Sequence, residues 1–424
     1  MENSDIKKTV LSQGLSFIVY AKVCLICLLT QIFYSQYKAT SNIGGLFALG
    51  DDAPGFDAAV RSRYSPIIGQ HYFGDLLDGH SNFGLRGSYY GLSYVFFWLT
   101  KGFSYKIVFV MFVLFGIVIC GLSIKRWVKI VADDQKNMVY ALHFSYPFVF
   151  AADRGQMHLL IGYLFALGLS FIVKTQGDKK VLAHGQLALG AAFSIKLFPS
   201  IIFAFFPKFW SIQRWKILMS SFFGLVLVSS FLSPDKFRIL KSGFSSKELY
   251  NLPFYFDETL LFNTSLKALI FNFQSLNIVL FENVFDFLFL NYFMIYLVYA
   301  AAAFVFMQSK NIRSHERLLV GAIISISIAP IAAVYCQTIV AACALWSLTC
   351  DQFVSILRRR FYVLVVLISI VPSTVPLKSD MINRWRFQST IVPLAQHAYV
   401  VTMCVVVAIG YLSSRRNSIM IENL

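Results

Sequence analysis

The chain has 424 residues, of which 57% are hydrophobic and only 14% are charged. A soluble domain usually carries about a quarter charged residues, so this composition argues for lipid as the solvent. The net charge of +16 comes from short basic clusters between apolar blocks, as in cytoplasmic loops. A basic soluble face with interleaved aromatic residues is absent from the sequence, so no nucleic-acid partner is expected.

The apolar blocks predict an all-α polytopic membrane protein with about twelve transmembrane helices and both termini inside. The first span is expected at Leu15–Tyr34, which is too long for a cleavable signal sequence. The other spans are expected at Tyr105–Ile124, Met138–Ala152, Met157–Val173, Val181–Ile195, Phe198–Phe209, Ile217–Leu232, Phe285–Met307, Leu318–Tyr335, Gln337–Leu348, Phe361–Val375 and Val392–Tyr411.

Basic clusters orient these spans, because cytoplasmic loops are rich in Lys and Arg. The predicted inner clusters include Lys125, Arg126 and Lys129; Lys208, Arg214 and Lys216; Lys310, Arg313 and Arg317; and Arg358, Arg359 and Arg360. This orientation puts two long polar loops, residues 35–102 and 233–277, on the outer side. The aromatic, amphipathic segment Tyr89–Phe103 is expected to form a helix at the membrane interface.

Several of the expected helices are too short to cross a hydrocarbon core of about 30 Å. Short helices need surrounding protein or a water-filled cavity to satisfy their backbone groups. Together with the two large loops, they predict an outward-facing cavity.

The first outer loop carries an acidic stretch with Asp51, Asp52 and Asp57 among glycine and proline residues. A turn is one interpretation, because this composition favours turns. The alternative is a carboxylate that acts as a general base toward a hydroxyl group.

Two basic sites lie at the outer ends of expected spans. Asp153-Arg154-Gly155-Gln156 forms either a tight turn or an anion site, because Arg presents a fork of donors suited to phosphate. Lys196 precedes the helix-breaking Pro199. Its ammonium either snorkels to the interface or binds phosphate, and its place between two short helices favours phosphate. Arg384 and Arg386 fit either an anionic head group or an interfacial anchor.

The seven cysteines lie in or beside apolar segments, and the seven histidines show no metal-ligand spacing. We therefore expect neither a metal site nor a cofactor. The sequence also has no Gly-rich phosphate loop and no Gly-x-Ser-x-Gly elbow, so ATP-driven and serine-hydrolase mechanisms lack their residues.

Four short motifs occur in a recognisable order. Gly155-Gln156-Met157-His158 follows the pattern Gly-Gln-x-Asn, and residues 190–199, which include Lys196, follow Gly-x-Ala-x-x-x-Lys-x-x-Pro. Asn263-Thr264-Ser265-Leu266 follows Asn-Gln-Ser-Leu, and Asp52 stands before an Ala-rich stretch and a Gly. In these motifs the chain resembles glycosyltransferase family 87, the polyprenol-phosphate-mannose-dependent mannosyltransferases of the GT-C superfamily.

The chain departs from that family at four places. His158 stands where the family prefers Asn, and Thr264 replaces Gln. The family's Tyr-Pro-Pro segment is absent, and its Ser-Pro-x-Ser-Trp segment is reduced to Ala329-Pro330-Ile331-Ala332. These departures leave the sugar and the acceptor open.

The resemblance covers residues 12–340 and implies a GT-C-like membrane catalytic module over residues 1–340, followed by C-terminal transmembrane helices over residues 341–424. It implies an integral protein of the cell membrane whose active site faces outward. A polyprenyl-phosphate donor would pass one sugar, a hexose such as mannose, to a hydroxyl of an envelope glycan or glycolipid, with inversion.

The resemblance also implies roles for particular residues. Asp52, with Asp51 as its rival, would deprotonate the acceptor hydroxyl. The residues implied in binding the donor phosphate are Lys196, Arg154, Gln156 and Arg386. Those implied in contacts with the sugar or acceptor are Asp57, His158, Asp257 and Asn263.

Two other functions stay open as alternatives. A flippase or transporter of lipid-linked sugars predicts charged ion relays deep within spans, whereas only Lys22 lies well inside an expected span. An envelope polysaccharide polymerase or ligase shares the many helices and large outer loops, but is expected to depend on Arg and His in one outer loop. The sequence favours glycosyl transfer and does not define the linkage or the oligomeric state.

Overall fold

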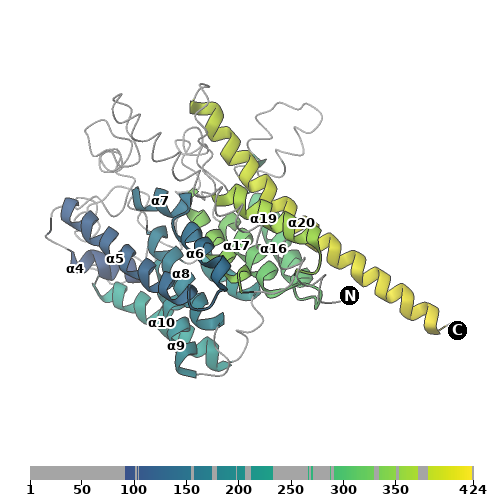
Figure 1. Cartoon of the computed structure of the whole chain (residues 1–424), viewed down its shortest axis with the longest axis horizontal. Coiled ribbons are helices and arrows are strands. Elements are labelled where there is room, and N and C mark those ends of the chain that lie inside the picture. The colour runs from purple at the N-terminus through teal and green to yellow at the C-terminus, as the bar shows by residue number, and fades with distance from the viewer. Residues whose placement is uncertain are drawn as a thin grey trace.

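The computed structural model describes residues 91–100, 103, 105–153, 157–173, 179–196, 198–205, 212–232, 266, 269–270, 287, 291–328, 334–349, 353–370 and 381–422. Within these ranges every regular element is a helix (Figure 1), which confirms the all-α class for this part of the chain. The expected first span and most of both predicted outer loops lie outside the described residues.

From Tyr105 onward, described helices lie at all the expected spans but several bounds differ, most of all for α20, which has 42 residues where Val392–Tyr411 was expected. They are α4 (Leu92–Leu99), α5 (Tyr105–Trp127), η1 (Asp133–Gln135), α6 (Lys136–His143), α7 (Tyr146–Asp153), α8 (His158–Val173), α9 (Lys179–Ile195), η2 (Phe198–Phe205), α10 (Ile212–Leu232), α16 (Tyr292–Met307), α17 (Ser314–Ile328), η6 (Val334–Gln337), α18 (Thr338–Ser347), α19 (Ile356–Ile370) and α20 (Met381–Glu422). The helix expected in the segment Tyr89–Phe103 is present as α4.

The prediction of one continuous helix over Met138–Ala152 is wrong, because α6 ends at His143 and α7 begins at Tyr146. Pro147 explains the break: it has no backbone N–H, and its ring excludes the carbonyl four residues earlier, that of His143. Tyr163 Oη donates a hydrogen bond to this carbonyl oxygen at 3.1 Å, so the break leaves it satisfied.

The short segment after Pro199 also differs from expectation, because η2 is a 3-10 helix. At a rise of about 2.0 Å per residue it is about 16 Å long, roughly half of a hydrocarbon core. It packs against α17, where a Cβ added at Gly321 would lie 3.0 Å from Phe205 Cβ. Protein therefore encloses this segment, as the backbone of a short helix requires.

Two of the described helices have the length and apolar composition of membrane spans, over Val110–Trp127 and Thr390–Ser413. Only 33% and 39% of these windows are buried inside the protein, whereas a core helix of a soluble protein is mostly buried. The predicted total of about twelve spans is not confirmed by these two.

Large exposed apolar side chains also cover one face each of α5, α10, α16 and α20, among them Leu114, Val118, Phe231, Val298 and Val401. Exposed apolar faces of this kind mark sites of contact with a membrane or with another protein.

Helix α8 lies at the centre of the bundle, where it packs against α5, α9 and α18. Small residues let α8 and α9 approach closely: a Cβ added at Gly185 would lie 3.0 Å from the carbonyl oxygen of Gly168. The long helix α20, which contains Pro393, crosses α16, α17 and α19 obliquely, and its C-terminal part projects beyond the other described helices (Figure 1).

Candidate functional site

The start of α8, the end of α9 and the short helix η6 meet at one place. His158 is the first residue of α8, Lys196 follows the last residue of α9, and Cys336 lies in η6. Cys336 and His158 are in contact although 178 residues separate them along the chain. The predicted topology puts all three residues at outer ends of spans, so their convergence agrees with that topology. We refer to His158, Lys196 and Cys336 as the outer polar cluster.

Within the outer polar cluster, the imidazole of His158 is fully buried and its Nε2 lies 3.4 Å from Cys336 Sγ. The backbone carbonyl of His158 accepts a hydrogen bond from Thr338 Oγ1 at 3.2 Å, which fixes the start of α8 against α18. Lys196 is only partly buried, and it interacts electrostatically with both His158 and Cys336. The cluster therefore combines a partly buried cation with a buried imidazole and a buried thiol.

Local sequence determines where Lys196 lies. Helix α9 ends at Ile195, and Pro199 prevents the chain from continuing as an α-helix. Next to Lys196, Ser194 Oγ accepts a hydrogen bond from the backbone N–H of Leu92 at 3.2 Å. Gly91 permits this approach, because its φ is 50° and a Cβ there would lie 2.4 Å from the Ser194 side chain. The start of α4 is therefore fastened to the end of α9 beside Lys196.

A buried network of amide side chains connects η6 to α19 and α20. Gln396 Nε2 on α20 donates hydrogen bonds to Gln337 Oε1 at 2.7 Å and to Ser369 Oγ at 2.8 Å. The three side chains are buried and come from η6, α19 and α20. Gln337 directly follows Cys336 in the chain, so this network holds the turn that presents Cys336 to His158.

The next residue of α20, His397, links three helices. Its Nε2 lies 3.1 Å from Ser327 Oγ on α17, and its Nδ1 lies 2.9 Å from Tyr299 Oη on α16. Both ring nitrogens of this buried imidazole thus have a hydroxyl partner, which suits a neutral histidine with one donor and one acceptor nitrogen. His397 serves as a polar link within the bundle.

Of the residues singled out in the sequence, the structure brings together His158 and Lys196. Arg386 lies in α20, whose first turns also include Arg384. The other predicted residues lie outside the described part of the chain: Asp51, Asp52, Asp57, Arg154, Gln156, Asp257 and Asn263. Their roles stay predictions.

The sequence interpretation missed Cys336, Gln337 and Gln396. A cysteine in an apolar segment is usually a small hydrophobic residue, so nothing in the sequence singles out Cys336. The two glutamines carried a signal, because amide side chains within or beside expected spans often form hydrogen bonds between helices. Their partners, however, lie 59 residues apart in the chain and follow from the fold.

No protein-family model, curated protein or solved structure matches this chain, so its resemblance to glycosyltransferases is carried by the motifs alone.

Proposed function

We propose that this chain is a membrane glycosyltransferase that uses a polyprenyl-phosphate sugar as donor. It transfers a single sugar, with inversion, to a hydroxyl of an envelope glycan or glycolipid on the outer face of the cell membrane. The observation that carries the proposal is the position of Lys196, a partly accessible cation at the broken end of α9, beside His158 and Cys336.

Lys196 suits the departing group of this reaction. As the bond between the anomeric carbon and the phosphate oxygen breaks, negative charge grows on the polyprenyl phosphate that leaves. An ammonium offers three N–H donors and a full positive charge, and its effect is larger near buried groups than in water. The proposal therefore assigns Lys196 to the donor phosphate.

The acceptor side of the reaction is assigned from the sequence. The carboxylate of Asp52, or of Asp51, takes the proton of the acceptor hydroxyl, and the resulting oxygen attacks the anomeric carbon from the face opposite the phosphate. The sugar ends up bonded to the acceptor, and polyprenyl phosphate leaves with the electron pair of the broken bond.

Lipid-facing helices suit the delivery of such a donor. A polyprenyl chain is apolar and reaches a membrane enzyme sideways through the bilayer. The apolar exterior of α5 and α10, with exposed residues such as Leu114 and Phe231, allows the rest of the lipid to stay in the hydrocarbon region.

The test is transfer of radiolabelled sugar from polyprenyl-phosphate donors, in membranes that carry wild-type or variant protein at matched levels. We expect Lys196→Met to reduce transfer by about 100-fold, because removal of one preorganised group that stabilises transition-state charge has effects of that order. Lys216→Met is the matched control, since Lys216 is exposed on α10. It should transfer at the wild-type rate.

The variant Asp52→Asn is measured in the same assay. It should abolish sugar transfer and leave donor binding unchanged. Full activity of Lys196→Met would contradict the proposal, because the proposal rests on the position of Lys196. Full activity of Asp52→Asn would move the base to Asp51 or Asp57. If the wild-type protein instead joins preassembled lipid-linked oligosaccharides, it is a polymerase.

A further inference from the structure

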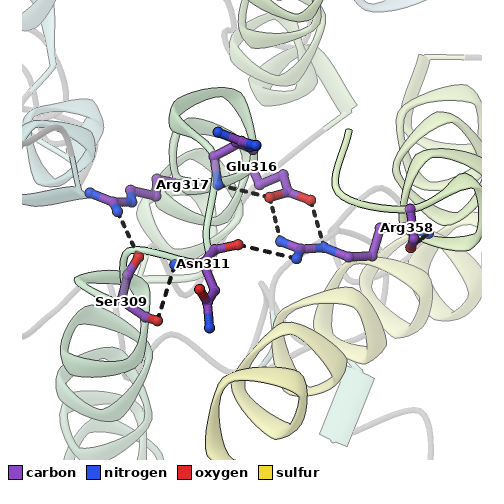
Figure 2. Close-up of polar contacts among 7 residues, drawn as sticks. Ser309, Asn311, Glu316, Arg317 and Arg358 are labelled. Atoms are coloured by element: carbon purple, nitrogen blue, oxygen red, sulfur yellow. Dashed lines mark hydrogen bonds and ion pairs between the residues drawn. The ribbon is translucent and has the colours of Figure 1, made fainter. Parts of the chain in front are cut away.

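Two predicted inner basic clusters, far apart in the chain, meet at one corner of the bundle (Figure 2). Arg358 at the start of α19 donates from Nε to Glu316 Oε1 at 2.9 Å and from Nη2 to Glu316 Oε2. Its Nη1 also donates to the carbonyl oxygen of Asn311 at 3.2 Å. The loop before α17 and the start of α19 are thereby fixed side by side.

We call the basic side chains gathered there the inner basic corner: Lys310, Arg313, Arg317, Arg358, Arg359 and Arg360. Within residues 308–317 and 353–360, which the structure describes in full, Glu316 is the only carboxylate. Glu316 is fully buried and is already engaged by Arg358 and by the backbone N–H of Arg313. The positive charge of the corner is therefore in large excess.

Three of these cations face outward, because Lys310, Arg313 and Arg360 are exposed. The N-termini of α17 and α19 add their own partial positive charges at the same place. These positive charges repel one another, and an anion bound at the surface would relieve the repulsion.

Exposed apolar side chains adjoin the corner on α19. Ile356 and Leu357, in the first turn of α19, are 72% and 77% exposed. Cations and apolar surface are thus presented together, as at a membrane–water boundary.

We propose that the inner basic corner binds the head group of an anionic phospholipid. Lys310 and Arg313 contact the phosphate, Arg360 adds to the positive charge around it, and the acyl chains lie along Ile356 and Leu357 of α19. The charge excess selects an anionic over a zwitterionic lipid, and the adjoining apolar side chains select a lipid over a free anion. This site lies at the opposite end of the bundle from the outer polar cluster and does not depend on the proposed sugar transfer.

The experiment uses the purified full-length chain in mixed micelles and counts bound lipids by native mass spectrometry. Phosphatidylglycerol is titrated against phosphatidylcholine for the wild type, for Lys310→Gln/Arg313→Gln/Arg360→Gln, and for the matched control Lys125→Gln/Lys129→Gln/Lys216→Gln. Each triple variant removes three exposed cations from inner clusters. We expect the wild type and the control to prefer phosphatidylglycerol at least about tenfold, and the corner variant to prefer it less than about twofold.

Equal loss of preference in both triple variants would mean that net charge alone attracts the lipid, and would overturn the proposal. Displacement of phosphatidylglycerol by millimolar inorganic phosphate would show that the site binds a free anion and not a lipid, and would overturn the proposal. The melting temperature of each variant is measured alongside. If the corner variant does not fold, the single variants Lys310→Gln and Arg360→Gln replace it, and each must weaken phosphatidylglycerol binding relative to Lys125→Gln.

Discussion

Glu316 is the described residue on which most of the local structure at the predicted inner end depends. Its two carboxylate oxygens accept from Arg358 and from the backbone N–H of Arg313, and its side chain is fully buried. A buried ion pair contributes little net stability compared with a hydrophobic pair, but loss of one partner leaves the other charge buried and uncompensated. The side chain of Arg358 is only 10% exposed, so little solvation is available to it.

We therefore expect Glu316→Gln to destabilise the protein by about 3 kcal/mol. The measurement is thermal or denaturant unfolding of the purified protein in detergent, followed by intrinsic tryptophan fluorescence. An unchanged melting temperature would show that Arg358 reaches water or another anion, and that the corner does not rely on Glu316.

Asp133→Asn is the control for that experiment. Asp133 forms an ion pair with Lys136 at 2.6 Å, but its side chain is 93% exposed. The hydrogen bond and charge of Lys136 lower the pKa of Asp133, so the pair exists at neutral pH. Exposed pairs contribute little to stability, and this variant should melt at the wild-type temperature.

At the residue scale, the sequence predicted Lys196 and His158 because each belongs to a short motif beside a helix end. Glu316 and Gln396 could not be predicted in their roles. Each is bonded to a residue tens of positions away, Arg358 at a separation of 42 and Gln337 at a separation of 59. Hydropathy records that a polar residue lies near a span, and the packing of helices decides which partner it meets.

Among the elements, the crossing of α8 and α9 depends on two glycines. A Cβ added at Gly168 would lie 2.6 Å from Leu189 Cγ and 3.0 Å from the carbonyl oxygen of Gly185. Leu189 is fully buried, and the carbonyl belongs to the backbone of α9, so neither can move without shifting the neighbouring helix. Close approach through small residues is a common way for membrane helices to pack.

Gly168→Ala should therefore lower the free energy of unfolding by about 1–3 kcal/mol, the cost of overpacking a core. Gly121→Ala on α5 is the matched control, because nothing lies within 4 Å of a Cβ added there. It should be neutral or stabilising by up to about 1 kcal/mol, since Ala favours helix more than Gly. Comparable melting temperatures for both variants would contradict the close packing of α8 on α9.

Element boundaries show what hydropathy captures and what it omits. It located α8, α9 and α19, because each is a nearly continuous apolar run. It merged α6 and α7 into one span, although Pro147 was visible in the sequence, since a sliding average does not register a missing N–H. It also could not distinguish the 3-10 geometry of η2, which is enclosed against α17.

At the scale of the whole molecule, the two polar clusters that the structure describes lie toward opposite ends of the bundle. His158, Lys196 and Cys336 lie at one end, and Glu316 with Arg358 at the other. Helix α20 spans the distance, because Gln396 belongs to the network behind η6 whereas Gly410 lies beside Asn311. At 1.5 Å per residue these two positions on α20 are about 21 Å apart. This distance is about two thirds of a hydrocarbon core of about 30 Å, and it separates the two clusters along the bundle.

The last prediction assigns these ends to the two sides of the membrane. Phe103 is exposed, just beyond α4, whose first residue is bonded to Ser194 beside Lys196. Lys310 is exposed at the inner basic corner. We expect a membrane-impermeant maleimide to label Phe103→Cys on intact cells, and Lys310→Cys only after permeabilisation.

Wild-type protein gives the background of that labelling, and Cys336 and Cys343 should add little to it because they are buried. Labelling of Lys310→Cys, but not of Phe103→Cys, on intact cells would put Lys196 on the cytoplasmic side. Sugar transfer on the outer face would then be impossible at this site. Labelling of both variants on intact cells would mean that the two ends share one side, and that the bundle does not cross the membrane as proposed.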